Sequence, residues 1–185
     1  ESVALGDIDE DGDLDAFVGN RDTHSEIWVN DGTGVFSAQA HSDGKPDTIG
    51  VAMGDLDGDG DLDVIQGNDQ ATPASSCQAN RIWLNAGGQQ GGTLGNFVDS
   101  GQILGDACTF AITLADLDGD NDLDGFAANY GGQANIVWIN QGNLQGGTLG
   151  SFISNTQRLG NSHSYGVELG DLDGDGDLDA FVVND

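Results

Sequence analysis

Aspartate stands at every second position in four nine-residue stretches of this chain. The stretches are DIDEDGDLD from Asp7, DLDGDGDLD from Asp55, DLDGDNDLD from Asp116 and DLDGDGDLD from Asp171. Positions one, three and five offer carboxylates that can converge on one cation, position seven offers its backbone carbonyl, and position nine a further carboxylate. Hard oxygen donors in this order indicate a calcium site. The candidate ligands are Asp7, Asp9, Asp11, Asp13, Asp15, Asp55, Asp57, Asp59, Asp61, Asp63, Asp116, Asp118, Asp120, Asp122, Asp124, Asp171, Asp173, Asp175, Asp177 and Asp179.

Position six of each acidic loop must turn sharply, and glycine and asparagine best tolerate the left-handed backbone of such a turn. That position holds Gly12, Gly60, Asn121 and Gly176. No glutamate follows at position twelve as in an EF-hand, so the aspartate at position nine must close the site. Magnesium prefers strict octahedral shells that keep several waters, and zinc prefers His or Cys. We therefore predict about four bound Ca²⁺ ions, rather than solvated acidic turns.

Short apolar segments surround every acidic loop and repeat in the same phase. VALG, VAMG, ITLA and VELG precede the loops, and AFVGN, VIQGN, GFAAN and AFVVN follow them. A tryptophan segment (EIWVN, RIWLN, IVWIN) and a Gly-x-Phe segment complete the first three repeats. Four short strands in a period of roughly 40–60 residues are typical of a β-propeller blade.

The chain is therefore predicted to be one all-β repeat domain over residues 1–185, with blades of four antiparallel strands. Its approximate repeats are 1–48, 49–109, 110–164 and 165–185, the last a partial repeat with only the first two strands, A and B. We expect the tryptophans and the following phenylalanines to fill the space between blades. Small residues before each acidic loop (Gly6, Gly54, Ala115 and Gly170) suit the crowded innermost strand.

Composition excludes several classes of partner. The chain has 32 acidic and 4 basic residues, a formal net charge of −28, so it cannot neutralise nucleic-acid phosphate. No apolar run has the length of a membrane span, so we expect no membrane insertion. No signal-like segment is present, and Glu1 is interpreted as a processed or excised start.

At these residues the chain resembles the FG-GAP/VCBS repeat family, the blades of integrin-alpha-type β-propellers. The elements that carry the resemblance are DLDGDGDLD, the RIWLN-type strand and the GNF or GSF segment, in register over essentially the whole chain. The resemblance implies that the acidic loops join the first two strands of each blade and bind Ca²⁺ on one face. Family propellers commonly have seven blades, so we expect either a portion of a longer propeller or copies that pair through open strand edges.

The two cysteines lie in loops predicted to share one face of the molecule. If the strands run up and down, the loop between strands B and C and the loop between strands D and A share the face opposite the acidic loops. Cys77 and Cys108 fall in such loops of one repeat. We predict a Cys77–Cys108 disulfide, consistent with an oxidising, secreted setting, and two free buried thiols are the alternative.

No catalytic motif accompanies the acidic loops. GxSxG, HExxH and a Cys/His couple are absent, and aspartates committed to metal are poor general acids or bases. The chain is therefore predicted not to be an enzyme, but an extracellular or cell-surface calcium-binding module with a structural, adhesive or filament-assembly role. Its expected partner is a protein, either another copy of the chain or an adhesion partner, or a glycan. The alternatives are a lectin-like propeller that uses Tyr130 or Tyr165, and a non-catalytic segment of a larger secreted polysaccharide-active enzyme.

Overall fold

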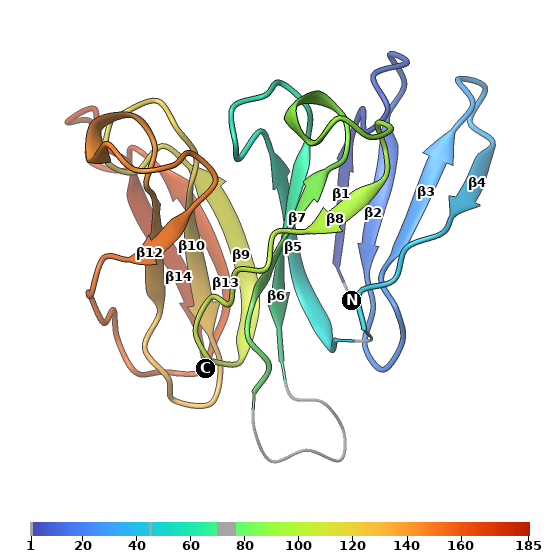
Figure 1. Cartoon of the computed structure of the whole chain (residues 1–185). Coiled ribbons are helices and arrows are strands. Elements are labelled where there is room, and N and C mark those ends of the chain that lie inside the picture. Colours follow the sequence, from blue (N-terminus) through green and yellow to red (C-terminus); the bar gives the residue numbers. More distant parts are fainter. Residues whose placement is uncertain (1, 45, 70–76) are drawn as a thin grey trace.

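The computed structural model describes residues 2–44, 46–69 and 77–185, and these fold as successive antiparallel β-sheets (Figure 1). Three sheets have four strands each and the last has two, which confirms the predicted all-β blades and the final hairpin. Among the described residues, no helix is long and apolar enough to cross a membrane. The strands are β1 (Ser2–Gly6), β2 (Asp15–Gly19), β3 (Glu26–Asn30), β4 (Phe36–Gln39), β5 (Thr48–Gly54), β6 (Asp63–Asn68), β7 (Arg81–Asn85), β8 (Phe97–Asp99), β9 (Thr109–Ala115), β10 (Asp124–Asn129), β11 (Ile136–Asn140), β12 (Phe152–Ser154), β13 (Ser164–Gly170) and β14 (Asp179–Asn184).

Blade 1 is β1–β4, blade 2 is β5–β8, blade 3 is β9–β12, and β13 with β14 forms the last hairpin. The first strands β1, β5, β9 and β13 lie next to one another and so form the inner edge of the arrangement. The acidic loops and the loops between the third and fourth strands, here called C–D loops, lie at the upper end of the blades in Figure 1. The loop after β10 lies at the lower end. The two faces predicted from up-and-down strands are therefore present.

The register of the first hairpin in each blade fixes the ends of the acidic loop. Gly6 pairs with Asp15 and Gly54 with Asp63, so the last residue of the first strand faces position nine of the loop. Ala115 pairs with Asp124 and Gly170 with Asp179 in the same way. Because the first strand ends and the second strand begins at this pair, every loop has the same length and the same placement of its carboxylates.

Apolar side chains fill the two spaces between the complete blades. Trp83 packs with Phe17 and Ile8 between blades 1 and 2, and Trp138 packs with Leu56 and Ile65 between blades 2 and 3. The predicted role of the tryptophans is thus confirmed in these two blades. It is wrong for blade 1, where Trp28 is only half-buried and Phe36 is exposed, because no described blade packs on that side.

A leucine from the next blade explains the small residues before the acidic loops. A Cβ atom built on Gly6 would lie 2.5 Å from Cδ1 of Leu62, and one on Gly54 would lie 2.5 Å from Cδ1 of Leu123. Since real Cβ atoms do not approach carbon so closely, a larger residue would force the leucine side chain to move from its packed position. Nothing lies near Gly170, which no further described blade covers.

The asparagine that ends each tryptophan strand ties one blade to the preceding acidic loop. Nδ2 of Asn85 donates to the carbonyl of Ile8 at 2.9 Å, and Nδ2 of Asn140 donates to the carbonyl of Leu56 at 2.9 Å. Both asparagines are fully buried, so these bonds are shielded from water. The sequence shows the repeated asparagine but not this contact, which links residues 77 and 84 positions apart.

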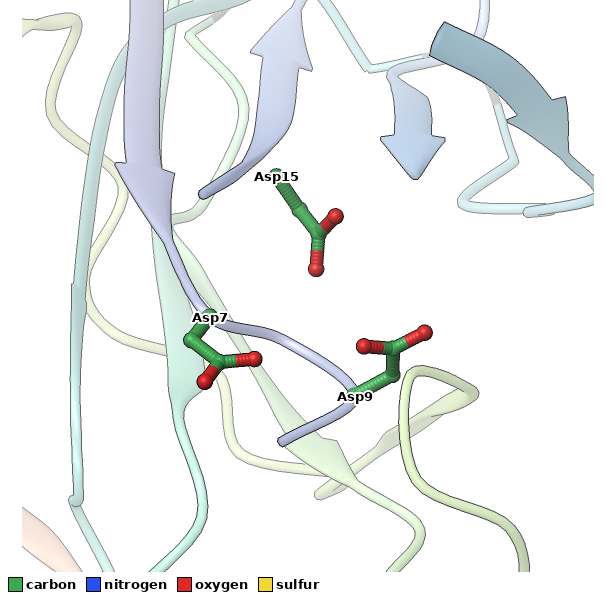
Figure 2. A group of neighbouring side chains, drawn as sticks. All are labelled: Asp7, Asp9 and Asp15. Carbon is green, nitrogen blue, oxygen red and sulfur yellow. The ribbon is translucent and has the colours of Figure 1, made fainter. Parts of the chain in front are cut away.

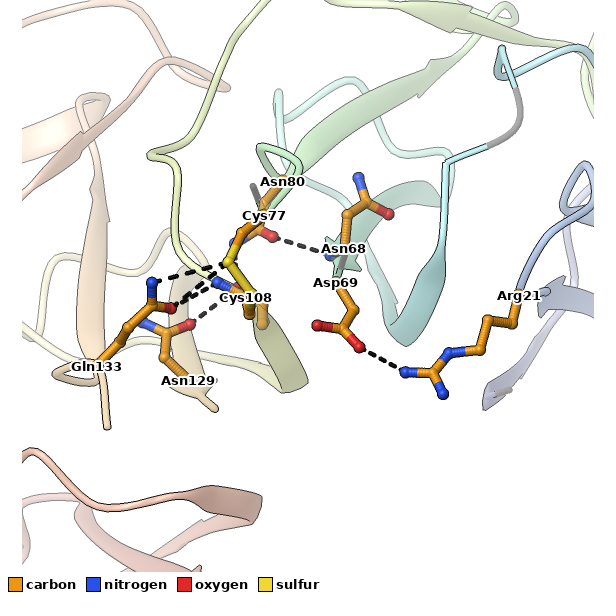
Figure 3. Close-up of a disulfide and its surroundings, with 9 residues drawn as sticks. Arg21, Asn68, Asp69, Cys77, Asn80, Cys108, Asn129 and Gln133 are labelled. Atoms are coloured by element: carbon orange, nitrogen blue, oxygen red, sulfur yellow. Dashed lines mark hydrogen bonds and ion pairs between the residues drawn. A yellow bond between two sulfur atoms is a disulfide. The ribbon is translucent and has the colours of Figure 1, made fainter. Parts of the chain in front are cut away.

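On the face opposite the acidic loops, a different interaction links neighbouring blades at each junction. Arg21 pairs with Asp69 between blades 1 and 2, as Figure 3 shows. The predicted disulfide joins Cys77 to Cys108, with a Cα–Cα distance of 4.8 Å, where the chain enters blade 3 (Figure 3). At the third junction, Tyr130 of blade 3 contacts the ring of Tyr165 in β13.

Candidate metal centre

Three carboxylates meet in each acidic loop, from positions one, three and nine. One oxygen of each lies within 4.8 Å of the others, and Figure 2 shows Asp7, Asp9 and Asp15 directed toward a common space. The position-five and position-seven carboxylates are not members of these groups. Their predicted roles as ligands, including the backbone carbonyl of position seven, therefore stay predictions. The four groups are Asp7, Asp9 and Asp15; Asp55, Asp57 and Asp63; Asp116, Asp118 and Asp124; and Asp171, Asp173 and Asp179.

The position-one carboxylate holds the turn of its own loop. In the first loop, the backbone N–H groups of Asp11 and Gly12 each donate to Asp7 at 3.0 Å. Gly12 has φ of 97° and Asn121 has φ of 69°, which is the left-handed backbone predicted for position six. The loop therefore folds around its first aspartate, and the carboxylates of positions three and nine converge on it.

The position-nine carboxylate is the most firmly held of the three. Asp63 is fully buried, and its two oxygens accept the N–H of Leu56 at 2.9 Å and that of Asn85 at 2.8 Å. Asp15 and Asp124 repeat both bonds. Asp179 accepts only the N–H of Leu172, because β14 has no described neighbour on its other side.

The position-three carboxylate supplies the test of whether the site fits a cation. Oδ1 of Asp9 and Oδ1 of Asp57 are buried and have no hydrogen-bond donor. A buried anionic oxygen without a donor is costly unless a positive charge faces it. Each of these atoms belongs to a residue whose carboxylate meets two others, so the residues present fit a hard cation bound by oxygen.

The electrostatics of the metal-free loop agree with that assignment. Burial, together with the charges of neighbouring aspartates, raises the pKa of Asp9, Asp57 and Asp118. Burial also raises the pKa of Asp63 to about 7, against the opposing effect of its two backbone hydrogen bonds. The folded chain thus holds carboxylates whose charged form is destabilised until a cation compensates them.

The long C–D loops of blades 2 and 3 close over the acidic loops. The side-chain amide of Gln90 donates to Oδ2 of Asp57 at 2.6 Å, and the N–H of Gln89 donates to Oδ2 of Asp59 at 2.7 Å. In blade 3 the side-chain amide of Gln145 donates to Oδ2 of Asp118, and the N–H of Leu144 donates to Asp120 at 3.3 Å. The loops therefore orient the ligands at positions three and five.

Sequence reasoning did not find these glutamines. A signal was available, because Gln90 and Gln145 each stand five residues after the asparagine that ends the tryptophan strand. The spacing has meaning only when the C–D loop is known to fold back onto the acidic loop. Each loop does so through a short 3₁₀ turn, Gly88–Gln90 in blade 2 and Asn143–Gln145 in blade 3.

Family models match most of the chain. A model described as an FG-GAP-like repeat matches residues 7–65 and 116–182, and a model described as an FG-GAP repeat matches residues 48–84. The matched ranges contain all four acidic loops. No curated protein matches the chain.

Proposed function

Because the chain belongs to the FG-GAP-like repeat family, whose repeats are generally non-catalytic structural modules, we propose that it is an extracellular calcium-stabilised propeller module with a structural or adhesive role. The observation that carries the proposal is the carboxylate group repeated at the same point of every blade. The disulfide supports an oxidising location outside the cell. The residues that hold the ion are the aspartates at positions one, three and nine, helped by position five and the carbonyl of position seven.

The ion supplies two positive charges to each cluster, and the chain supplies the geometry. Position one holds the turn, position nine joins the loop to the third strand, and position three presents its donor-free oxygen. With the ion bound, repulsion between the clustered aspartates no longer opposes closure of each first hairpin. Binding energy therefore becomes folding energy. Extracellular sites of this kind bind calcium at roughly 10⁻⁴–10⁻³ M.

Thermal unfolding with and without calcium tests the proposal. Saturation of one site at 100 times its Kd adds about 2.7 kcal/mol to the free energy of unfolding, and several sites add more. We expect the melting temperature to fall when EDTA removes calcium and to recover when calcium is restored. Magnesium at the same concentration serves as the matched control. An unchanged melting temperature after chelation would contradict calcium stabilisation.

Another copy of the chain is the partner that we favour. Val3 and Leu5 on β1 are 58% and 62% exposed, although the matching residues of blade 2, Val51 and Met53, pack against blade 1. Phe181 on β14 is 62% exposed, whereas residues at the same repeat position are at most 2% exposed: Phe17, Ile65 and Phe126.

The exposed face of β1 thus corresponds to the face that meets a preceding blade. The exposed face of β14 corresponds to the face that meets a following blade. Two copies can therefore join head to tail. Light scattering of the protein in calcium, over a range of concentrations, should show mass rising with concentration, and F181D should abolish the rise. A constant monomer mass would exclude self-assembly.

A glycan is the second candidate partner, supported by a cluster of rings on the face opposite the acidic loops. Phe110, Tyr130, His163 and Tyr165 lie with ring centroids 4.7 to 5.9 Å apart, and Tyr165 is 39% exposed. Exposed tyrosine offers both a stacking surface and a hydroxyl group. A glycan array with the wild type and Y165A decides this: binding lost in the variant supports a sugar site, and no binding by the wild type excludes it.

A further inference from the structure

We propose that blades 2 and 3 each bind a second hard divalent cation, between the carboxylates at positions five and seven of the acidic loop and beneath the C–D loop. The proposal extends the proposed function, because it takes the first calcium site of each loop as given. The residues of the second site are Asp59 and Asp61 in blade 2, and Asp120 and Asp122 in blade 3; the position-five carboxylates of Asp59 and Asp120 are shared with the first site.

The position-seven carboxylates are buried without any donor. Asp61 is 3% exposed and Asp122 is 7% exposed, and all four of their carboxylate oxygens lack a hydrogen-bond partner. This is the same property that marks the position-three oxygen of the first site, but here it affects both oxygens of the residue. A calcium loop of this type uses only the backbone carbonyl of position seven, so the first ion does not account for these side chains.

A second carboxylate faces each of these groups. Oδ1 of Asp59 accepts the backbone N–H of Asp61 at 3.3 Å, and Oδ1 of Asp120 accepts that of Asp122 at 3.0 Å, so the position-five carboxylate lies beside position seven in both loops. Ionised carboxylates only accept hydrogen bonds, so neither member of a pair can satisfy the other while both are charged. A cation between them removes the repulsion and supplies the missing partner at once.

The C–D loop forms a close cover over each pair. A Cβ atom on Gly87 would lie 2.6 Å from Oδ2 of Asp61, and one on Gly142 would lie 2.7 Å from Oδ2 of Asp122. Glycine therefore lets the loop backbone approach the carboxylate without displacing it. In blade 2, Oε1 of Gln90 in the same loop is also buried and has no hydrogen-bond donor.

The other two acidic loops lack the burial of this pair, although a Cβ atom on Gly32 in blade 1 would also lie 2.3 Å from Oδ2 of Asp13. Asp177 in the last hairpin is exposed, because no described C–D loop covers it. Blade 1 has a shorter C–D turn, residues 31–35, and Asp13 beneath it is half-buried. The structure therefore distinguishes two covered loops that hold the extra ion from two that do not. All the donors are oxygens, which selects calcium or another hard divalent cation over zinc.

Calcium stoichiometry tests the second site. Native mass spectrometry in saturating calcium should count two ions more than the four acidic groups for the wild type. The double variant D61N/D122N should lose those two ions, because asparagine keeps the backbone carbonyl and the shape but removes the charge. D177N is the matched control, since it makes the same change in an uncovered loop, and its count should equal that of the wild type.

The outcomes separate the two proposals. Four ions in the wild type, with or without the double substitution, would overturn the second site and leave the proposed function intact. No bound calcium would overturn both. If the double variant fails to fold, anomalous diffraction from calcium-loaded wild-type crystals replaces it: a peak between Asp59 and Asp61 supports the site, and peaks confined to the first sites contradict it.

Discussion

Replacing Asp63 by asparagine tests how much the position-nine carboxylate contributes apart from metal binding. Asp63 is fully buried and bridges two backbone N–H groups, that of Leu56 in the acidic loop and that of Asn85 at the end of β7. It therefore joins the loop to the third strand of the blade. Asparagine has nearly the same shape but only one oxygen, so its NH₂ group must face one of the two N–H groups.

The expected cost follows from these two bonds. A hydrogen bond to a charged group contributes about 1.5–3 kcal/mol, and a buried donor left without an acceptor costs about 1–3 kcal/mol. D63N keeps one weakened bond and loses the other, so the free energy of unfolding should fall by about 2–4 kcal/mol. For a chain of this length, that corresponds to a melting temperature lower by roughly 4–16 °C.

The measurement is thermal and urea unfolding in EDTA at about pH 8, where the Asp63 carboxylate, whose pKa is raised to about 7, is charged. EDTA removes the contribution of bound calcium. D179N is the matched control, because Asp179 accepts a single backbone N–H and is half-exposed. Its amide oxygen can keep that bond, so the loss should stay below about 1 kcal/mol. Equal losses for D63N and D179N would refute the bridging role of position nine.

Three further outcomes follow from the same structure. In the metal-free protein, Asp61, Asp63 and Asp122 have pKa values raised from 3.8 to about 7, so the folded state holds protons that the unfolded state has lost. The melting temperature of the metal-free protein should therefore fall as pH rises from about 4 to about 7. In saturating calcium it should rise over the same pH range, because protons compete with the ion for the carboxylates. A parallel trend of melting temperature with and without calcium would contradict this. Q90M removes the bond to Asp57 and should weaken calcium binding at that loop severalfold by isothermal titration, while Q157M, in an exposed loop, should not; equal affinities would exclude a positioning role for Gln90. C77S/C108S should lower the free energy of unfolding by about 2–4 kcal/mol in urea, and a loss seen equally in reduced wild type confirms that the disulfide is responsible.

The local pattern predicted the strands and the acidic loops well, because each depends on residues close together in the chain. A left-handed turn at position six needs glycine or asparagine, and Gly12 and Asn121 adopt it. The short apolar segments on both sides of each loop indicate strands, and those after the loops in blades 2 and 3, β6 and β10, are buried at every position. The Cys77–Cys108 disulfide could be predicted from topology alone, since up-and-down strands place the two loops on one face.

The covering of the acidic loops could not be predicted in this way. Gln90 contacts Asp57 only because the C–D loop folds back across 33 positions, and Asn85 reaches Ile8 across 77 positions. Such contacts depend on how whole strands are placed, and a repeat pattern marks the recurring residues without giving their partners. The same reason explains the mistaken expectation for Trp28, whose burial needs a neighbouring blade.

The sequence by itself determined the blade repeat, the oxygen-rich loops and the concentrated negative charge that favours a cation, because these follow from residue type and spacing. Tertiary structure alone decided that the four loops are unequal. In two of them the position-seven carboxylates, Asp61 and Asp122, are buried without a donor, and in the other two the position-seven aspartate is half-buried or exposed. The physical reason is burial: identical aspartates differ in the cost of their charge once different chain segments exclude water from them.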